Sequence, residues 1–181
     1  DEQDHASLDA ERSVLAAMLL GSDAIMTSRG LLDPASFYLD AHRPIFSAFL
    51  ALADRGEPVD IVTACDELRR RGDLEAVGGQ SFVAGLCDSA TTSANLETHC
   101  AIVREAHAKR SLRRLARDLE AGAEDPASTS AELRAHVEAA LRDLPASQRG
   151  GGRFAEAAVN GHDFAALGIP QPRSILGNGV L

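Results

Sequence analysis

The stretch from Ala41 to Gly72 constrains the fold most, because it contains two amphipathic helices, the turn between them and a stop signal. In its first half, apolar residues recur every three or four positions, which is the spacing of one broad apolar face on a helix. Pro44 fits the first turn of this helix, where a backbone N–H has no intrahelical partner to lose. We therefore expect a buried helix that begins near Asp40 or Ala41.

A second helix follows in the same stretch. Gly56 and Pro58 end the first helix, and Asp60 is placed to cap the next one with its carboxylate. The run Arg69–Arg71 brings positive charge to the negative end of the helix dipole, and Gly72 suits a left-handed stop. Two capped helices in close succession favour a helical fold.

Composition points the same way. Only 4% of the 181 residues are aromatic and none is Trp, so the core must be built mostly from Leu, Ala, Val and Ile, which suit closely packed helices. No apolar run approaches about 18 residues, so we expect no membrane partner. The net charge of −9 argues against capture of nucleic acid by the whole surface, although a local basic strip could still bind it.

Two absences bear on activity and compartment. The only lysine, Lys109, follows Ala108, so the Gly-Lys-Ser/Thr of a P-loop, or Walker A motif, does not occur, and we expect no ATP hydrolysis by this chain. The three cysteines, Cys65, Cys87 and Cys100, are an odd number without a secretory leader, which predicts a reduced, cytoplasmic setting.

Other segments of the first 95 residues carry weaker signals. Ser7 or Asp9 can cap a first helix, which Gly21 and Ser22 then weaken at its end. A cap followed by proline at Asp33-Pro34 predicts a short helical turn, and Gln80–Ser89 has helical spacing. We expect residues 1–95 to form a compact helical head.

Beyond residue 95 the apolar stripes become narrow, on either side of a break at Gly122 and Asp125-Pro126. A narrow stripe indicates one partner helix and not a surrounding core, so residues 96–146 are expected to form a projecting antiparallel helical hairpin. Its outer sides have no cover within the chain, which predicts pairing with a second copy. The residues predicted for this hairpin and oligomer interface are Leu112, Leu115, Leu119, Leu133, Val137 and Leu141.

A basic strip stands out on the first hairpin helix. The spacing of Arg110, Arg113, Arg114 and Arg117 puts them largely on one side, where they could meet the phosphates of DNA or an acidic partner helix. The alternative is a solvated face opposite the leucines. Both interpretations stay open.

We find no pattern for catalysis or metal binding, and we predict no catalytic, cofactor or metal residues. The six histidines do not form a ligand set, and His42 is interpreted as a capping or core-edge residue. The pairs Asp9 with Glu11 and Asp66 with Glu67 are interpreted as solvated polar faces, and no Ser/His/Asp arrangement is defensible as a triad.

The last segment, residues 147–181, is expected to be a flexible linker and the lead-in to a C-terminal domain that this chain lacks. It opens with Gly150–Gly152 and continues with Gly and Pro at short intervals, too few apolar residues for a core of its own. We expect the chain to be part of a longer protein.

Several short blocks, taken in order, resemble the N-terminal domain of DnaB-type replicative DNA helicases. The blocks are Asp9–Leu20, Asp33–Tyr38, Ala41–Phe46, Arg55–Asp60, Leu68–Leu74, Val77–Gly79, Ser93–Asn95 and Ile102–Glu105. The tail from Gly161 to Leu181 is more similar to the approach to a plasmid- or phage-type RecA-like ATPase.

The resemblance implies a helical head and a hairpin that pairs subunits in the collar of a hexameric ring. It also implies docking of primase or a helicase loader, passage of single-stranded DNA with weak contacts at most, and a bacterial, plasmid or phage replisome in the cytoplasm. ATP and Mg²⁺ are implied only for the RecA-like domain beyond the linker. We thus predict a non-catalytic assembly and docking domain of an ATP-dependent helicase.

Two alternatives remain for the function. A stand-alone helical adaptor or inhibitor could mimic such a collar. A helix-turn-helix DNA-binding module could use Asp60–Arg71 as its recognition helix.

Overall fold

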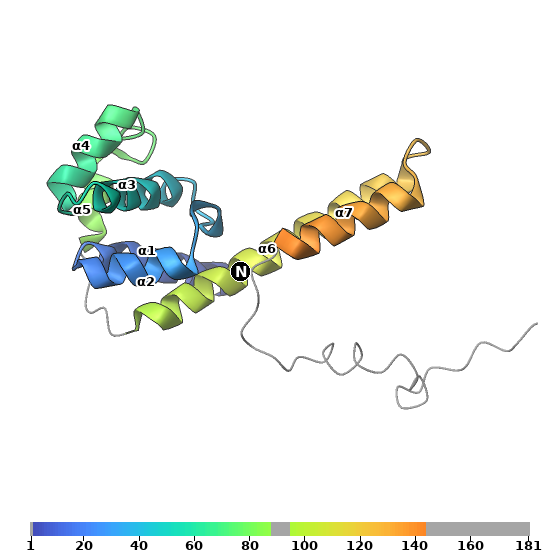
Figure 1. The fold of residues 1–181 in the computed structure, drawn as a ribbon, viewed down its shortest axis with the longest axis horizontal. Helices are drawn as coiled ribbons and strands as arrows, with labels where there is room; N and C mark the ends of the chain where they lie inside the picture. The colour runs from blue at the N-terminus through green and yellow to red at the C-terminus, as the bar shows by residue number, and fades with distance from the viewer. Residues whose placement is uncertain (1, 88–94, 144–181) are drawn as a thin grey trace, which may run out of the picture. The chain divides into compact units, whose positions relative to one another are not determined.

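The computed structural model describes residues 2–87 and 95–143, which belong to one compact unit, Asp1–Pro145. Within these ranges every regular element is helical, and the all-α prediction is confirmed. The elements are α1 (Glu2–Met18), α2 (Ser22–Leu31), the 3-10 helix η1 (Pro34–Ser36), α3 (His42–Asp54), α4 (Ile61–Arg71), α5 (Gly79–Gly85), α6 (Leu96–Glu124) and α7 (Ser130–Asp143). Figure 1 shows α1 to α5 gathered at one end of α6.

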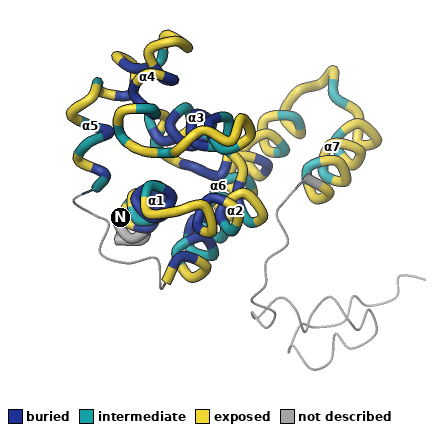
Figure 2. Tube along the Cα trace, turned by 60° about the vertical axis from the view of Figure 1, so that its left-hand side comes forward, coloured by how far each residue is buried: buried dark blue, intermediate teal, exposed yellow. Residues whose placement is uncertain are grey.

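The core lies among α1 to α5, which form the head, and the first part of α6. Figure 2 shows the buried stretches concentrated in these helices. The largest fully buried apolar side chains are Leu15, Met18, Phe37, Ile45, Phe46, Phe49, Leu52 and Leu68. Four of these eight lie on α3, the helix with the broad apolar face, so this helix is the centre of the head.

The two predicted helices of the central stretch are confirmed, and so are both caps of the second one, α4. The Asp60 carboxylate accepts hydrogen bonds from the backbone N–H groups of Val62 (2.8 Å) and Thr63 (2.9 Å), and the Thr63 hydroxyl accepts from the Asp60 N–H at 3.0 Å. The bonds from Thr63 contribute most to lowering the pKa of Asp60. Gly72 has φ +80°, the left-handed stop that was expected.

Three predicted helix boundaries are wrong. α1 begins at Glu2, before either expected cap, and Ser7 is buried inside it. Glu, Gln and Ala in the segment before Ser7 favour the helical conformation, so the helix includes that segment as well. α2 begins at Ser22, where only a helix end was expected; its buried face of Ala24, Ile25 and Ser28 is too sparse to produce a periodic pattern. α5 ends at Gly85, short of the predicted Ser89, which lies outside the described residues.

Glu11 is fully buried, so its interpretation as part of a solvated face is wrong. Its carboxylate accepts hydrogen bonds from the backbone N–H groups of Tyr38 (2.6 Å) and Leu39 (3.3 Å). His42 is fully buried too, inside the core and not at its edge, and its Nδ1 lies 2.8 Å from Glu11 Oε2. The carboxylate is tolerated there because three donors replace its water.

Glu67 is the second acidic residue whose interpretation is wrong, since its side chain is only 3% exposed. It accepts hydrogen bonds from Arg71 (2.5 Å), Arg55 (2.8 Å) and Arg70. The bond from Arg71 contributes most to lowering the pKa of Glu67, from 4.5 to about 2. The run Arg69–Arg71 therefore ends α4, and two of its members, Arg70 and Arg71, also bind a buried carboxylate.

Candidate assembly interface on the helical hairpin

α6 is shared between two environments. Leu96, Cys100 and Val103 belong to the core under the head, so the expectation of a single partner helix along the whole stripe is wrong for its first half. Farther along, α6 extends away from the head, and α7 lies beside it (Figure 1). We call residues 106–143 the outer hairpin.

The turn between α6 and α7 is fixed by its own side chains. The Asp125 carboxylate accepts from the Ala127 N–H at 2.9 Å. The Glu132 carboxylate accepts from the N–H and the hydroxyl of Thr129, both at 2.8 Å, and these bonds lower the pKa of Glu132. In return, the Glu132 N–H donates to the Thr129 hydroxyl at 3.3 Å, and this reciprocal capping marks the start of α7.

The helices approach each other closely near this turn. A Cβ added at Gly122 would lie 2.6 Å from Cδ2 of Leu133, so the absence of a side chain on α6 makes room for a leucine of α7. The helix pair is thus packed tightly at its far end.

The six residues predicted for the interface lie in two kinds of place. Leu115 is buried, and Leu119, Leu133 and Val137 are partly buried. Leu112 and Leu141 remain 46% and 54% exposed. The contact between α6 and α7 accordingly uses only part of the predicted apolar surface.

α7 is the least buried long helix. From Ser130 to Arg142 no residue is buried, and Figure 2 shows this helix almost wholly in the colours of exposed and intermediate residues. An isolated helix of this length is marginal in water, and most helical stability in proteins comes from packing an apolar face. A helix with so little cover offers its apolar side chains to a partner.

The four arginines of the predicted basic strip differ in their surroundings. Arg110 donates from Nη2 to the Ser36 carbonyl oxygen at 2.7 Å, and its guanidinium lies 5.3 Å from the centre of the Tyr38 ring. Arg113, Arg114 and Arg117 are exposed. The structure therefore separates one arginine that binds the head from three that face solvent.

A shallow cleft of about 290 Å³ lies between α6 and α7. It is lined by His107, Ser111, Arg114, Leu115, Asp118, His136 and Ala140. Burial lowers the pKa of His107, and the neighbouring arginines Arg110, Arg43 and Arg114 lower it further. In residues 2–87 and 95–143, no group of three or more His, Cys, Asp or Glu side chains could hold a metal ion.

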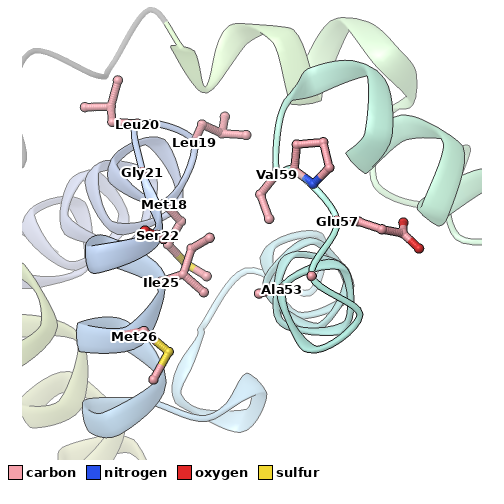
Figure 3. Close-up of a pocket in the computed structure, with 12 residues that line it drawn as sticks. Met18, Leu19, Leu20, Gly21, Ser22, Ile25, Met26, Ala53, Glu57 and Val59 are labelled. Carbon is pink, nitrogen blue, oxygen red and sulfur yellow. The ribbon is translucent and has the colours of Figure 1, made fainter.

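The head carries a separate apolar groove of about 470 Å³, which no sequence pattern predicted. It lies between the α1–α2 turn and the connection from α3 to α4, and Figure 3 shows Ile25 and Val59 pointing into it. Leu20 and Met26 at its edge are 55% and 62% exposed. Its residues come from segments about 30 positions apart, which no local pattern links.

None of the helices in the described part of the chain has both the length and the apolar character needed to span a membrane. The described cysteines are all free thiols.

Comparison with known families identifies the class of this fold. The sequence model of the family described as DnaB-like helicase N-terminal domain matches residues 3–105, which is more than half of the chain. The chain belongs to this family. The match covers the head and the first part of α6, where the blocks noted in the sequence lie.

Individual relatives are replicative DNA helicases. The chain is 40% identical over 138 residues to the replicative DNA helicase DnaB of Geobacillus stearothermophilus, and 41% identical over 119 residues to the replicative DNA helicase DnaC of Bacillus subtilis. These alignments cover 76% and 66% of this chain but only 30% and 26% of the relatives. The chain thus spans about a third or less of their length.

Solved structures agree. The N-terminal domain of DnaB helicase from Mycobacterium tuberculosis superposes with a TM-score of 0.70 at 36% identity, over 76% of this chain and 96% of that one. A structure of a DnaB-like replicative helicase and its interactions with primase has a TM-score of 0.59 at 22% identity, over 82% of this chain and 34% of that one. At this lower identity the likeness concerns the fold alone.

Proposed function

We propose that this chain is the assembly and partner-docking domain of a replicative DNA helicase, and that its outer hairpin pairs with the outer hairpin of a second copy. Catalysis of ATP hydrolysis and DNA unwinding, with ATP and Mg²⁺, would belong to a further domain of the same protein. The setting would be the bacterial cytoplasm, or a plasmid or phage replisome within it. Family membership supports this role.

The observation that carries the proposal is the exposure of α7 and its neighbours. α7 has no buried residue from Ser130 to Arg142, while Leu112 and Leu141 present apolar surface on the two helices. Burial of such side chains against a second hairpin would stabilise both copies by about 1.5–3 kcal/mol for each fully buried leucine. A dimer is the smallest assembly that provides this cover, and a hexameric ring could be built from such dimers.

The test is sedimentation equilibrium over a wide range of concentrations. The unaltered chain should associate as its concentration rises, whereas L112R and L141R should shift association to much higher concentration. L20R is the matched control, because Leu20 is as exposed as these leucines but lies on the head. A chain that stays monomeric throughout, or an L20R effect equal to that of L112R, would overturn the proposed pairing.

Primase or a helicase loader is the partner we propose for the assembled domain. The support is that a DnaB-like replicative helicase of the same fold was solved with its interactions with primase. Calorimetric titration with the helicase-binding part of a bacterial primase, and separately with a loader, should give saturable heat with one of them. Heat from neither would favour the stand-alone adaptor.

Single-stranded DNA is a weaker candidate, which the exposure of Arg113 and Arg114 favours. If they contact phosphates, R113E/R114E should lower both the affinity and its dependence on salt. An unchanged salt dependence would reject this contact.

The helix-turn-helix alternative is disfavoured by the surroundings of α4. Ala64, Cys65 and Leu68 are buried in the core, and Arg70 and Arg71 bind Glu67. A recognition helix needs its polar side chains, here the arginines, free to enter a groove of DNA. A sequence-specific shift of duplex DNA by the chain would revive this alternative.

A further inference from the structure

The segment Ser36–Leu39, which we call the joint, is held by three helices at once. From α1, Glu11 accepts from the backbone N–H groups of Tyr38 and Leu39. From α3, Arg43 Nε donates to the Phe37 carbonyl oxygen at 2.9 Å. From α6, Arg110 Nη2 donates to the Ser36 carbonyl oxygen at 2.7 Å. Four consecutive residues therefore connect the head to the helix that carries the outer hairpin.

Arg110 makes the farthest of these contacts along α6. The residues of α6 that lie in the core end at Val103, two turns earlier, and Arg110 reaches back across 74 positions in the sequence to Ser36. Its guanidinium also lies 5.3 Å from the centre of the Tyr38 ring, and the N–H of the same Tyr38 is bound by Glu11. The Arg110 contact thus connects α6 to a piece of backbone that is itself fixed.

We propose that Arg110 is a positioning residue that sets the direction of the outer hairpin relative to the head. A charge-assisted hydrogen bond and a cation–π contact both act on one guanidinium, and together they oppose bending of α6 where it leaves the core. Without them, α6 keeps its core contacts through Leu96, Cys100 and Val103, but the two turns after Val103 lose the hydrogen bond and the ring contact that hold them to the joint.

This assignment distinguishes Arg110 from its neighbours on the same helix, although the spacing of the four arginines made them look equivalent. The importance of the hairpin direction for assembly rests on the proposed function. The direction itself is a property of one chain, so it is measurable whether or not the chain assembles, and the two proposals can fail separately.

The experiment measures the distance distribution between two nitroxides, one on the head at V62C and one on the outer hairpin at E120C, in a C87S background. Val62 and Glu120 are exposed, and the buried Cys65 and Cys100 stay unlabelled in the folded chain. Labelled chain is diluted into an excess of unlabelled chain, so that only distances within one molecule are reported.

R110A should broaden this distribution, and R110K should restore it in part, because lysine can donate to Ser36 but lacks the planar group that stacks on Tyr38. R113A is the matched control, an exposed arginine removed from the same helix. Amide exchange at residues 106–112 should rise about tenfold in R110A, as expected for loss of a hydrogen bond to a charged group. The melting temperature of the head should barely change.

A distribution in R110A as narrow as in the unaltered chain, or equal broadening in R113A, would overturn the assignment. If R110A does not fold, the same distance measurement on Y38A tests the proposal instead. Y38A removes only the stacking contact from a ring that is 50% exposed, and it should broaden the distribution less than R110A would. An unchanged distribution in a folded Y38A chain, with R110A unfolded, would also count against the positioning role.

Discussion

The head and the outer hairpin use the same aliphatic side chains but cover them to very different extents. Leu52 on α3 is 2% exposed, surrounded by the other helices of the head, whereas Leu112 on α6 is 46% exposed. The head also encloses two carboxylates with their donors, while the acidic residues from Asp118 to Glu138 on the outer hairpin are exposed. The head, with the first part of α6, therefore encloses a core, whereas α7 has no buried residue from Ser130 to Arg142 and the outer hairpin has apolar surface left for a partner.

The largest effect should come from the buried carboxylate of the head. E11A leaves the N–H groups of Tyr38 and Leu39 and the ring of His42 without their acceptor, so it should lower the free energy of unfolding by about 3–5 kcal/mol. Urea denaturation followed by circular dichroism measures this loss. D9A, an exposed acid on the same helix, should leave the midpoint almost unchanged. A small loss in E11A would mean that the head relaxes around the gap.

The two leucines give the most direct test of the comparison. L52A should lower the free energy of unfolding by about 2–5 kcal/mol, because it empties space in a closed core. L112A, measured at the lowest workable concentration, should stay within about 0.5 kcal/mol of the unaltered chain. Equal losses would show that Leu112 is covered already in the single chain, and the contrast between the two regions would fail.

Glu67 adds a dependence on pH that belongs to the head alone. Its pKa is lowered in the folded chain from 4.5 to about 2, so its contribution to stability is present above about pH 4.5 and is lost as the pH falls towards 2. The difference in urea midpoint between E67Q and the unaltered chain should therefore be largest at neutral pH and shrink through this window. D66N supplies the control, since Asp66 is 77% exposed. If the difference in urea midpoint between E67Q and the unaltered chain did not change with pH, the negative charge of Glu67 would not be what stabilises the head.

The smallest effect is expected in the outer hairpin. G122A brings a Cβ to 2.6 Å from Leu133 Cδ2, but this end of the leucine can move, and alanine favours helix over glycine by about 1 kcal/mol. The two effects should nearly cancel. In an L133A background the clash is gone, so G122A should then increase stability by up to about 1 kcal/mol. If G122A lowered the stability of the L133A chain, the added Cβ would be strained against a residue other than Leu133.

Short patterns in the sequence correctly predicted the features that depend on neighbouring residues, such as helix caps and turns. The N-cap at Asp60 and the left-handed stop at Gly72 were predicted correctly, because both features depend only on the few residues beside them. The hairpin turn and the helical class of the fold follow from the same kind of signal, and the family blocks identified the head. The boundaries proposed at residues 95 and 146 stay predictions, as does the linker in 147–181, which lies outside the described residues.

Partners distant in the sequence explain what could not be predicted. Glu11 is buried because Tyr38 and Leu39 come to it from 27 and 28 positions away. Arg110 differs from Arg113 through its contacts with Ser36, 74 positions away, and with the ring of Tyr38. Neither periodicity nor composition contains such information. For the candidate interface, the sequence named Leu112 and Leu141 among six residues, but it could not tell which of the six α6 and α7 cover between themselves.

The continuity of α6 has a consequence for insertions and deletions. Each residue of an α-helix turns it by about 100° and lengthens it by about 1.5 Å. One residue inserted between Val103 and Arg110 would keep the helix intact but rotate Leu112 and all of α7 to another side of the molecule. Seven residues would nearly restore the rotation while moving the far end outward by about 10 Å. The number of residues in α6 thus determines the side of the molecule to which the outer hairpin points, as well as its distance from the head.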